Sequence, residues 1–280
     1  MDAELGPALE LARRNQVEGR LARAYPGQLA GIAAEVEEAG ARFRRNLGEA
    51  TGRLGARGVQ AVLIKADPKS DYVYSNFDLV LPEDQWKAAR IALEGWYAHQ
   101  STYWLERTTK VLLEPPVGPA AHLHRAVSWF GITVIPAARL FACSAPDGGN
   151  PWLIPGPAAR LRIWLAHGLF QNLELDLSEL LAVRELLVPE VVAQARAEAA
   201  QEGWARAFDG ALATASGAIA RLDRGSSVRL PVPLPLPVAL RAGAEHAVFL
   251  LRGGRPREAV REAALRLPLV AAKRRRMLSR

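Results

Sequence analysis

The 280-residue sequence has a single cysteine, Cys143, which excludes an internal disulfide framework and is typical of proteins in a reducing compartment. It has no run approaching the ~20 apolar residues of a membrane span, so we expect no membrane partner. The N-terminal residues are acidic and amphipathic and lack the apolar core of a signal peptide. These absences predict a cytoplasmic protein.

Acidic residues are scarce at one end of the chain, and this explains the net charge of +7. Residues 241–280 contain 11 Lys or Arg and 3 Asp or Glu, whereas the other 240 residues contain 25 Lys or Arg and 26 Asp or Glu. The sequence does not interleave basic with aromatic residues and has no base-recognition motif, so a nucleic-acid partner is not expected. We interpret the basic tail, residues 269–280, as a solvated segment that the core does not require.

The first half of the chain predicts an α/β (α+β) fold, a mixed sheet with flanking helices. Apolar residues at helical spacing predict helices within residues 3–57, and short β-branched runs predict strands at 59–66 and 76–81. Pro82 should open a helix that stops near Gly95. Alternating residues then predict strands within 101–116 and 120–130.

The second half predicts a mostly helical domain, with residues 143–157 as a turn-rich connection to it. Helices are expected from Ala158 to Asp223, and the alternating prolines of residues 228–243 predict an extended, Pro-rich strap. The last helix, 255–278, should break at Pro268. We therefore divide the chain into a sheet domain, 1–145, and a helical domain, 146–280.

The order of these pieces resembles the uncharacterised bacterial nucleotidyltransferase family, which has the nucleotidyltransferase fold. Five stretches carry the resemblance: "VLIKA" at 62–66, "YSNFDLVL" at 74–81, "EGWYA" at 94–98, "AHLHRAVSW" at 121–129 and "LAHGLFQNLELDLSELL" at 165–181. The resemblance implies carboxylates that converge on Mg²⁺ to neutralise a nucleoside triphosphate.

The sequence departs from the family's metal-binding pattern at three positions. Asn76 replaces the first acid of an Asp-x-Asp pair, and only Asp78 remains of that pair. His122 falls where the resemblance implies a third carboxylate, and Ala66 replaces a glycine that would admit a phosphate. The charge that Mg²⁺ requires is therefore mostly missing, and no cofactor is expected.

A different set of polar residues remains at the same positions. Phe77 and Leu79 should enter the apolar layer, so Asp78 should face the opposite side. In the fold that the sequence resembles, that side is the cleft, so we expect Asp78, His122 and His124 to face one cavity, lined on one side by Lys65 and closed by the helical half. Such an Asp–His arrangement suits acid–base chemistry, and the His pair also forms half of a transition-metal site. The candidate catalytic residues are Asp78, His122, His124 and Lys65, and the candidate binding residues are Asn76, Tyr74, Trp104, Trp129 and His167. Ordinary structural roles remain open for the histidines and Lys65, and a hydrogen-bonded structural role is favoured for His167 near Asn172 and Asp176.

Three functions remain open at this point. The leading hypothesis is a nucleotidyltransferase-like protein reused as a small-molecule enzyme with metal-independent acid–base chemistry, in specialised bacterial (natural-product) metabolism. The first alternative is a divergent Mg²⁺-dependent nucleotidyltransferase. The second is a non-catalytic ligand-binding or regulatory protein.

Overall fold

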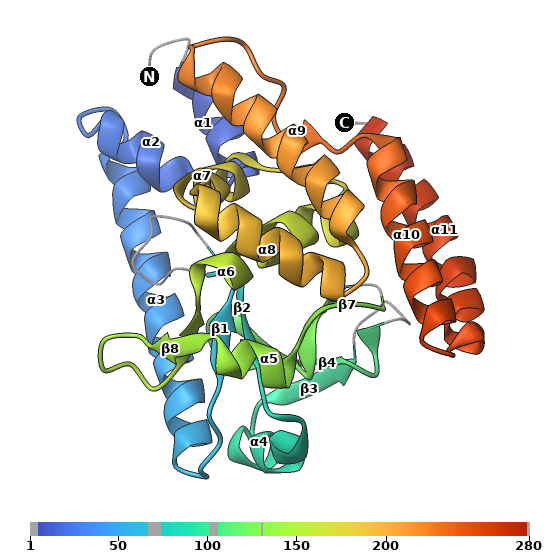
Figure 1. The fold of residues 1–280 in the computed structure, drawn as a ribbon. Coiled ribbons are helices and arrows are strands. Elements are labelled where there is room, and N and C mark those ends of the chain that lie inside the picture. The colour runs from blue at the N-terminus through green and yellow to red at the C-terminus, as the bar shows by residue number, and fades with distance from the viewer. Residues whose placement is uncertain (1–4, 67–73, 101–105, 130, 279–280) are drawn as a thin grey trace.

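A mixed β-sheet with helices on both faces forms the centre of the computed structural model, which describes residues 5–66, 74–100, 106–129 and 131–278 (Figure 1). The helices in chain order are α1 (Leu5–Arg14), α2 (Glu18–Ala24), α3 (Ala30–Gly55), η1 (Glu83–Gln85), α4 (Trp86–Ala92), α5 (Ala137–Ala142), α6 (Pro157–Ala166), the π-helix η3 (His167–Asn172), α7 (Leu177–Glu185), α8 (Pro189–Gln201), α9 (Ala205–Asp223), α10 (Leu236–Arg252) and α11 (Pro256–Leu278). The predicted α/β class, with a helical C-terminal half, is confirmed.

Seven strands form the main sheet in the order β3-β4-β5-β2-β1-β9-β8. Their bounds are β1 (Val62–Ile64), β2 (Asn76–Val80), β3 (Tyr97–Gln100), β4 (Lys110–Glu114), β5 (Ala120–His124), β8 (Ser144–Pro146) and β9 (Leu153–Pro155). β2 pairs antiparallel with β1 and parallel with β5, so that Asp78 lies opposite His122. Two ribbons complete the described strands: β6 (Ala126–Trp129) with β7 (Ile132–Pro136), and β10 (Glu174–Leu175) with β11 (Val232–Pro233).

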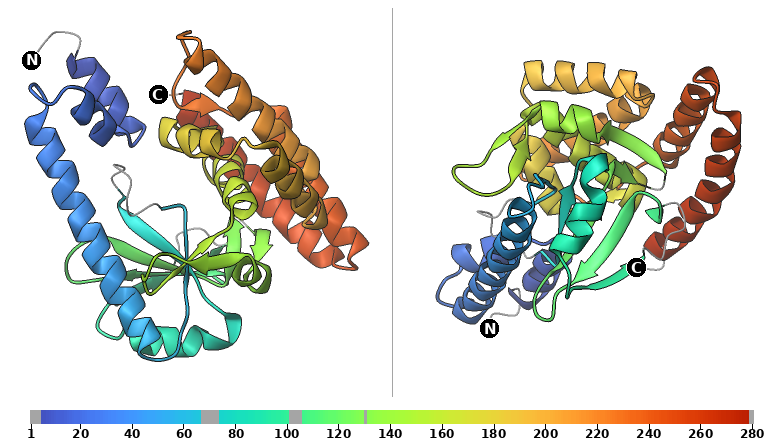
Figure 2. Two further views of the ribbon diagram at one scale, coloured as in Figure 1. Left: turned by 60° about the vertical axis from the view of Figure 1, so that its left-hand side comes forward. Right: turned by 90° about the horizontal axis from the view of Figure 1, so that it is seen from below.

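The alternation along the central strands divides the core into two layers. Leu63, Phe77 and Leu79 pack on one face of the sheet with apolar residues of α3 and α4. Ile64 and Val80 pack on the other face with residues of the helical half, including α6 and α9. Figure 2 shows α3 along one side of the sheet and the helical half on the other. The face that carries Asp78 is therefore the face that the helical half covers.

The N-terminal helices reach the helical half beyond the end of the sheet. The buried side chain of Asn15, just after α1, accepts a hydrogen bond from the backbone N–H of Leu177 at 3.0 Å. This contact satisfies a donor in the first turn of α7, which would otherwise lack an intrahelical partner.

The region from residue 143 to 157 differs from its prediction as a plain connection. It forms the hairpin β8–β9, and β9 extends the main sheet by pairing in parallel with β1. The glycines and prolines of this region indicated turns, so its two three-residue strands were not predicted from the sequence. The domain boundary that we placed at 145–146 falls inside this hairpin.

Proline positions caused two further errors. The strap is extended only up to Pro235, because α10 begins at Leu236. Pro237 lies in the first turn of α10, where backbone N–H groups have no partner within the helix, so a proline there costs no hydrogen bond. The predicted break at Pro268 is also wrong, since α11 continues through it to Leu278. Of the predicted strand or strands within 101–116, the described part contains β4, and β3 precedes that range. None of the described helices has the length and apolarity needed to cross a membrane.

Candidate functional site

Asp78 is the centre of a buried polar cluster on the helical side of the sheet. One carboxylate oxygen, Oδ1, lies 2.7 Å from His124 Nε2 and 3.5 Å from His122 Nδ1. The other, Oδ2, lies 3.0 Å from the Lys65 ammonium. Only 3% of the Asp78 side chain is exposed, so these partners replace water around the carboxylate.

The backbone at Lys65 has a conformation that is uncommon for a side-chain-bearing residue. Its φ is 61°, in the left-handed region, directly after the last residue of β1. Ile64 is paired with Asp78 across the two strands, so the turn at Lys65 directs the ammonium back over β2. Such strain persists where the surrounding structure fixes it, and it is concentrated at functional sites.

The partners of Asp78 determine the protonation of the cluster. Burial alone would raise the pKa of the Asp78 carboxyl, but the charge of Lys65 and the hydrogen bonds from His122 and His124 hold the pKa well below its usual range. Burial lowers the pKa of His124 to about 4, although Asp78 opposes this shift. At neutral pH, Asp78 is therefore ionised, and a neutral His124 donates its Nε2 proton to it.

A polar cavity of about 230 Å³ opens above Lys65 and Asp78. The sheet contributes these two residues with Tyr74 and Asn76, and the helical half contributes Trp164, His167, Gln171, Asn172, Asp176, Ser178 and Glu179. Gln16, next to the Asn15 contact, lines it from the N-terminal segment. The cavity thus lies between the two halves of the chain, where ligand sites are frequently found.

A second cluster of titratable groups faces Asp78 from the helical half. His167 begins the π-helix η3, and its Nδ1 makes a short hydrogen bond to Glu179 Oε1. Glu179 Oε2 accepts the backbone N–H of Asp176 at 3.0 Å, and Asp176 caps α7 in return by accepting the Glu179 N–H at 2.8 Å. π-helical turns are rare, and they occur frequently at functional sites.

The groups of this second cluster have strongly shifted pKa values. Burial raises the pKa of Glu179 to about 8. Burial, reinforced by the neighbouring Glu179 carboxyl, raises the pKa of Asp176 to about 7. Burial and the nearby Lys65 charge lower the pKa of His167 well below its usual value. At neutral pH the cavity is therefore bounded by the ionised Asp78 on the sheet and, on the helices, by a neutral His167, a largely protonated Glu179 and a partly protonated Asp176.

The predicted site residues fall into three groups. Lys65, Asp78, Tyr74, Asn76 and His167 line the cavity together. His124 and Trp129, each 1% exposed, lie behind this surface, and Trp129 packs edge-on against the His167 ring at 5.5 Å between ring centroids. His122 lies beside Asp78 on β5, with 12% of its side chain exposed, and does not line the cavity. Trp104 lies outside the described residues.

Sequence reasoning missed Glu179, and a usable signal was present. Glu179 follows Asp176 by three positions before an apolar run, which is the spacing of a capping box at the start of a helix. That motif would have placed the Glu179 carboxylate at the first turn of α7, within reach of Asp176. The contact with His167 depends on the π-helix, which the sequence pattern did not indicate.

Among the described residues, Asp78, His122 and His124 form a group that could hold a metal ion, because their donor atoms lie within 4.8 Å of one another. Two imidazoles and one carboxylate suit a transition metal better than Mg²⁺, which prefers oxygen ligands. The ammonium of Lys65 lies 3.0 Å from Asp78 and would repel a divalent cation at that position. A metal would therefore have to displace Lys65 from the carboxylate.

Searches for related proteins found no matching family model and no significant match among curated proteins.

Proposed function

We propose that this protein is a small-molecule enzyme that uses acid–base chemistry, without a divalent metal, on a scaffold like that of the nucleotidyltransferases. The observation that carries the proposal is the Lys65–Asp78 ion pair, nearly enclosed at the floor of a polar cavity. Enzymes concentrate such desolvated, charge-paired groups where they bind and polarise a substrate. The parallel pairing of β2 with β5, which sets Asp78 beside His122, supports the resemblance on which the scaffold assignment rests.

Lys65 supplies the fixed positive charge in this proposal. An ammonium that is largely removed from solvent, as that of Lys65 is, stabilises negative charge that develops on a substrate carbonyl or carboxylate oxygen. Asp78 orients the ammonium and lines the cavity with it. His122 and His124 act through Asp78, because they contact its carboxylate from the adjacent strand β5 and do not line the cavity. We therefore regard the two histidines as positioning residues.

Turnover of small metabolites tests the proposal. Pools of carbonyl and carboxylate compounds are incubated with the wild type, with Asp78→Asn and with Asp84→Asn, and the products are measured by mass spectrometry. Asp84 is an exposed acid on η1 and serves as the matched control. We expect turnover that falls by ~10²-fold or more in Asp78→Asn and is unchanged in Asp84→Asn. Full activity of Asp78→Asn would refute the site, and binding without any turnover would favour a non-catalytic binding protein.

A metal-dependent reaction is the second candidate, because Asp78, His122 and His124 can converge on one ion. Thermal shifts with ATP, with and without Mg²⁺ or Zn²⁺, separate it from the first. The acid–base proposal predicts no metal-dependent shift. A strong Mg²⁺-dependent shift with ATP that disappears in Asp78→Asn would instead support nucleotidyl transfer.

A further inference from the structure

A smaller cavity of about 50 Å³ adjoins the larger one. The two cavities share the lining residues Ile64, Lys65, Ala66, Tyr74 and Trp164. A molecule that occupies both would therefore pass over Lys65. The smaller cavity has room for only a few water-sized groups, so it suits one end of a ligand.

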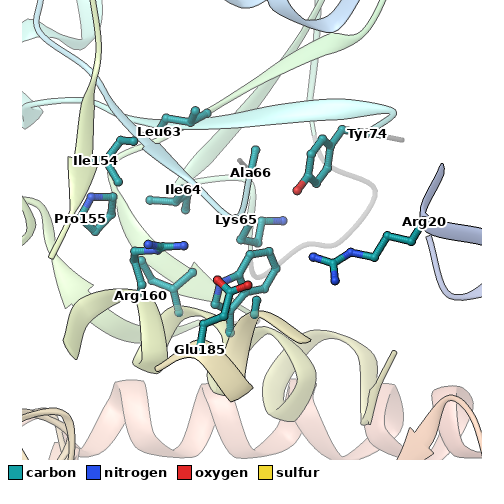
Figure 3. A pocket seen from close by; sticks show the side chains of 13 residues that line it. Arg20, Leu63, Ile64, Lys65, Ala66, Tyr74, Ile154, Pro155, Arg160 and Glu185 are labelled. Atoms are coloured by element: carbon teal, nitrogen blue, oxygen red, sulfur yellow. The ribbon is translucent and has the colours of Figure 1, made fainter. Parts of the chain in front are cut away.

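Cations from three elements line this smaller cavity. Arg20 comes from α2, Lys65 follows β1 and Arg160 comes from α6. Figure 3 shows the guanidinium groups of Arg20 and Arg160 reaching toward the space beside Lys65 from opposite sides. Glu185 is the one acid among the described lining residues, and its side chain is exposed to solvent. The described lining therefore holds three cations and one acid, and Lys65 among the cations is also paired with Asp78.

Arg160 is the most informative of these cations. It is half-buried, and no carboxylate of the described residues lies within ion-pair distance of its guanidinium. Arg162, two residues further along α6, differs because it is paired with Glu198. A partly desolvated guanidinium without an anionic partner in the described chain is suited to bind an anion, and its planar fork fits a carboxylate.

The remaining walls limit the kind of anion. They are mostly apolar and consist of Leu63, Ile64, Ala66, Ile154, Pro155, Ile163, Trp164 and Ala182, with the hydroxyl-bearing Tyr74 as the exception. A polyphosphate would bring several charges and many unsatisfied oxygens against these side chains, at a desolvation cost. An organic acid with one carboxylate and a small apolar body matches both the cations and the walls.

We infer that the smaller cavity is a subsite for the carboxylate of such an organic acid, with Arg160 as its principal anchor. The carboxylate lies between Arg160 and Lys65, the apolar part contacts Ile154 and Ile163, and the remainder of the molecule extends over Asp78. That this acid is the substrate rests on the proposed function, whereas the carboxylate subsite itself does not.

Calorimetric titration with benzoate tests the subsite directly. Benzamide is the neutral isostere, and pyrophosphate is the polyanionic comparator. Wild type is compared with Arg160→Gln, Arg160→Lys and Arg57→Gln, where Arg57 is an exposed arginine beyond the end of α3. We expect benzoate to bind more tightly than benzamide and pyrophosphate. Loss of a charge-assisted hydrogen bond should weaken benzoate binding by about tenfold or more in Arg160→Gln, less in Arg160→Lys and not in Arg57→Gln.

Three results would overturn the inference: equal benzoate affinity in the wild type and Arg160→Gln, equal affinity for benzamide and benzoate, or tighter binding of pyrophosphate than of benzoate. Melting temperatures of the variants verify that they are folded. Arg160-dependent benzoate binding without turnover of any acid would refute the proposed function and leave the subsite intact. Turnover that depends on Asp78 but not on Arg160, with no benzoate binding, would refute the subsite alone.

Discussion

Replacing Lys65 with methionine should lower the free energy of unfolding, because it leaves the buried carboxylate of Asp78 without its cationic partner. The side chains of Lys65 and Asp78 are 13% and 3% exposed, and their charged atoms lie 3.0 Å apart. Removing one partner of a buried ion pair typically costs about 3–5 kcal/mol, because the other charge stays buried. The contacts of Asp78 with His122 and His124 remain, so we expect a loss near the lower end, about 3 kcal/mol.

The loss should also depend on pH. In the wild type, the lowered pKa of Asp78 contributes stability above the carboxyl's unfolded pKa, and this contribution is lost as the pH falls through the folded pKa. Without Lys65, burial remains and the pKa of Asp78 rises, so protonation relieves the buried charge more readily. The stability difference between Lys65→Met and the wild type should therefore be larger at pH 7 than near pH 4, where more of the variant's Asp78 is protonated.

Thermal unfolding at both pH values measures this effect. A loss of about 3 kcal/mol corresponds to a fall of roughly 5 °C in the melting temperature of a chain of this size. Lys87→Met, which removes an exposed lysine of α4, is the control and should change little. The double variant Lys65→Met/Asp78→Asn should recover part of the loss, because no charge is left buried. A variant that melts within 1 °C of the wild type at both pH values (~0.6 kcal/mol or less) would refute the reasoning.

Three further predictions concern the helical half. Burial raises the pKa of Glu179 to about 8, so this group lowers the stability of the fold as the pH rises from the group's unfolded pKa toward 8. The variant Glu179→Gln should therefore gain stability relative to the wild type between pH 5 and pH 8. Denaturant titrations measure this, and a difference that does not change with pH would contradict it. Gly168→Ala should destabilise the protein by about 1–3 kcal/mol, because a Cβ there would lie 2.3 Å from Leu175 Cδ2, and an unchanged melting temperature would show that β10 can move away. Deleting residues 269–280 should leave the melting temperature nearly unchanged, since none of the described side chains in the segment is buried; a fall of many degrees would show that the tail is anchored.

The sheet side of the site was predictable because strand periodicity constrains it. Phe77 and Leu79 are fully buried in one layer, so Asp78 between them had to face the other layer. The same alternation placed His122 and His124 on one face, and the parallel register of β2 with β5 brought that face beside Asp78. Alternation could not show which of these side chains line the cavity. It did not predict that the histidines contact Asp78 from β5 without lining the cavity.

The helical side was less predictable because it depends on local departures from regular structure. The π-helix at His167–Asn172 ends at Leu173, whose φ of 62° is left-handed, and this geometry sets where His167 points. A regular helical repeat over the same residues would space the side chains differently. Arg20 and Arg160 are 140 positions apart in the sequence, so their approach to one cavity follows only from tertiary packing.

The two sides of the larger cavity hold carboxyl groups in opposite states. Asp78 is kept ionised by Lys65 and the histidines, whereas burial raises the pKa of Glu179 to about 8 and keeps it largely protonated at neutral pH. Because Glu179 Oε2 accepts the Asp176 N–H, the Glu179 proton belongs on Oε1, where it is donated to His167 Nδ1. That leaves His167 Nε2 with its proton and available to a ligand in the cavity. Enzymes assign acid and base roles to two carboxyl groups in one site by giving them environments that separate their pKa values. We propose that His167 donates its Nε2 proton in this reaction while its Nδ1 takes the proton of Glu179, and that Lys65 with Asp78 provides the fixed charge.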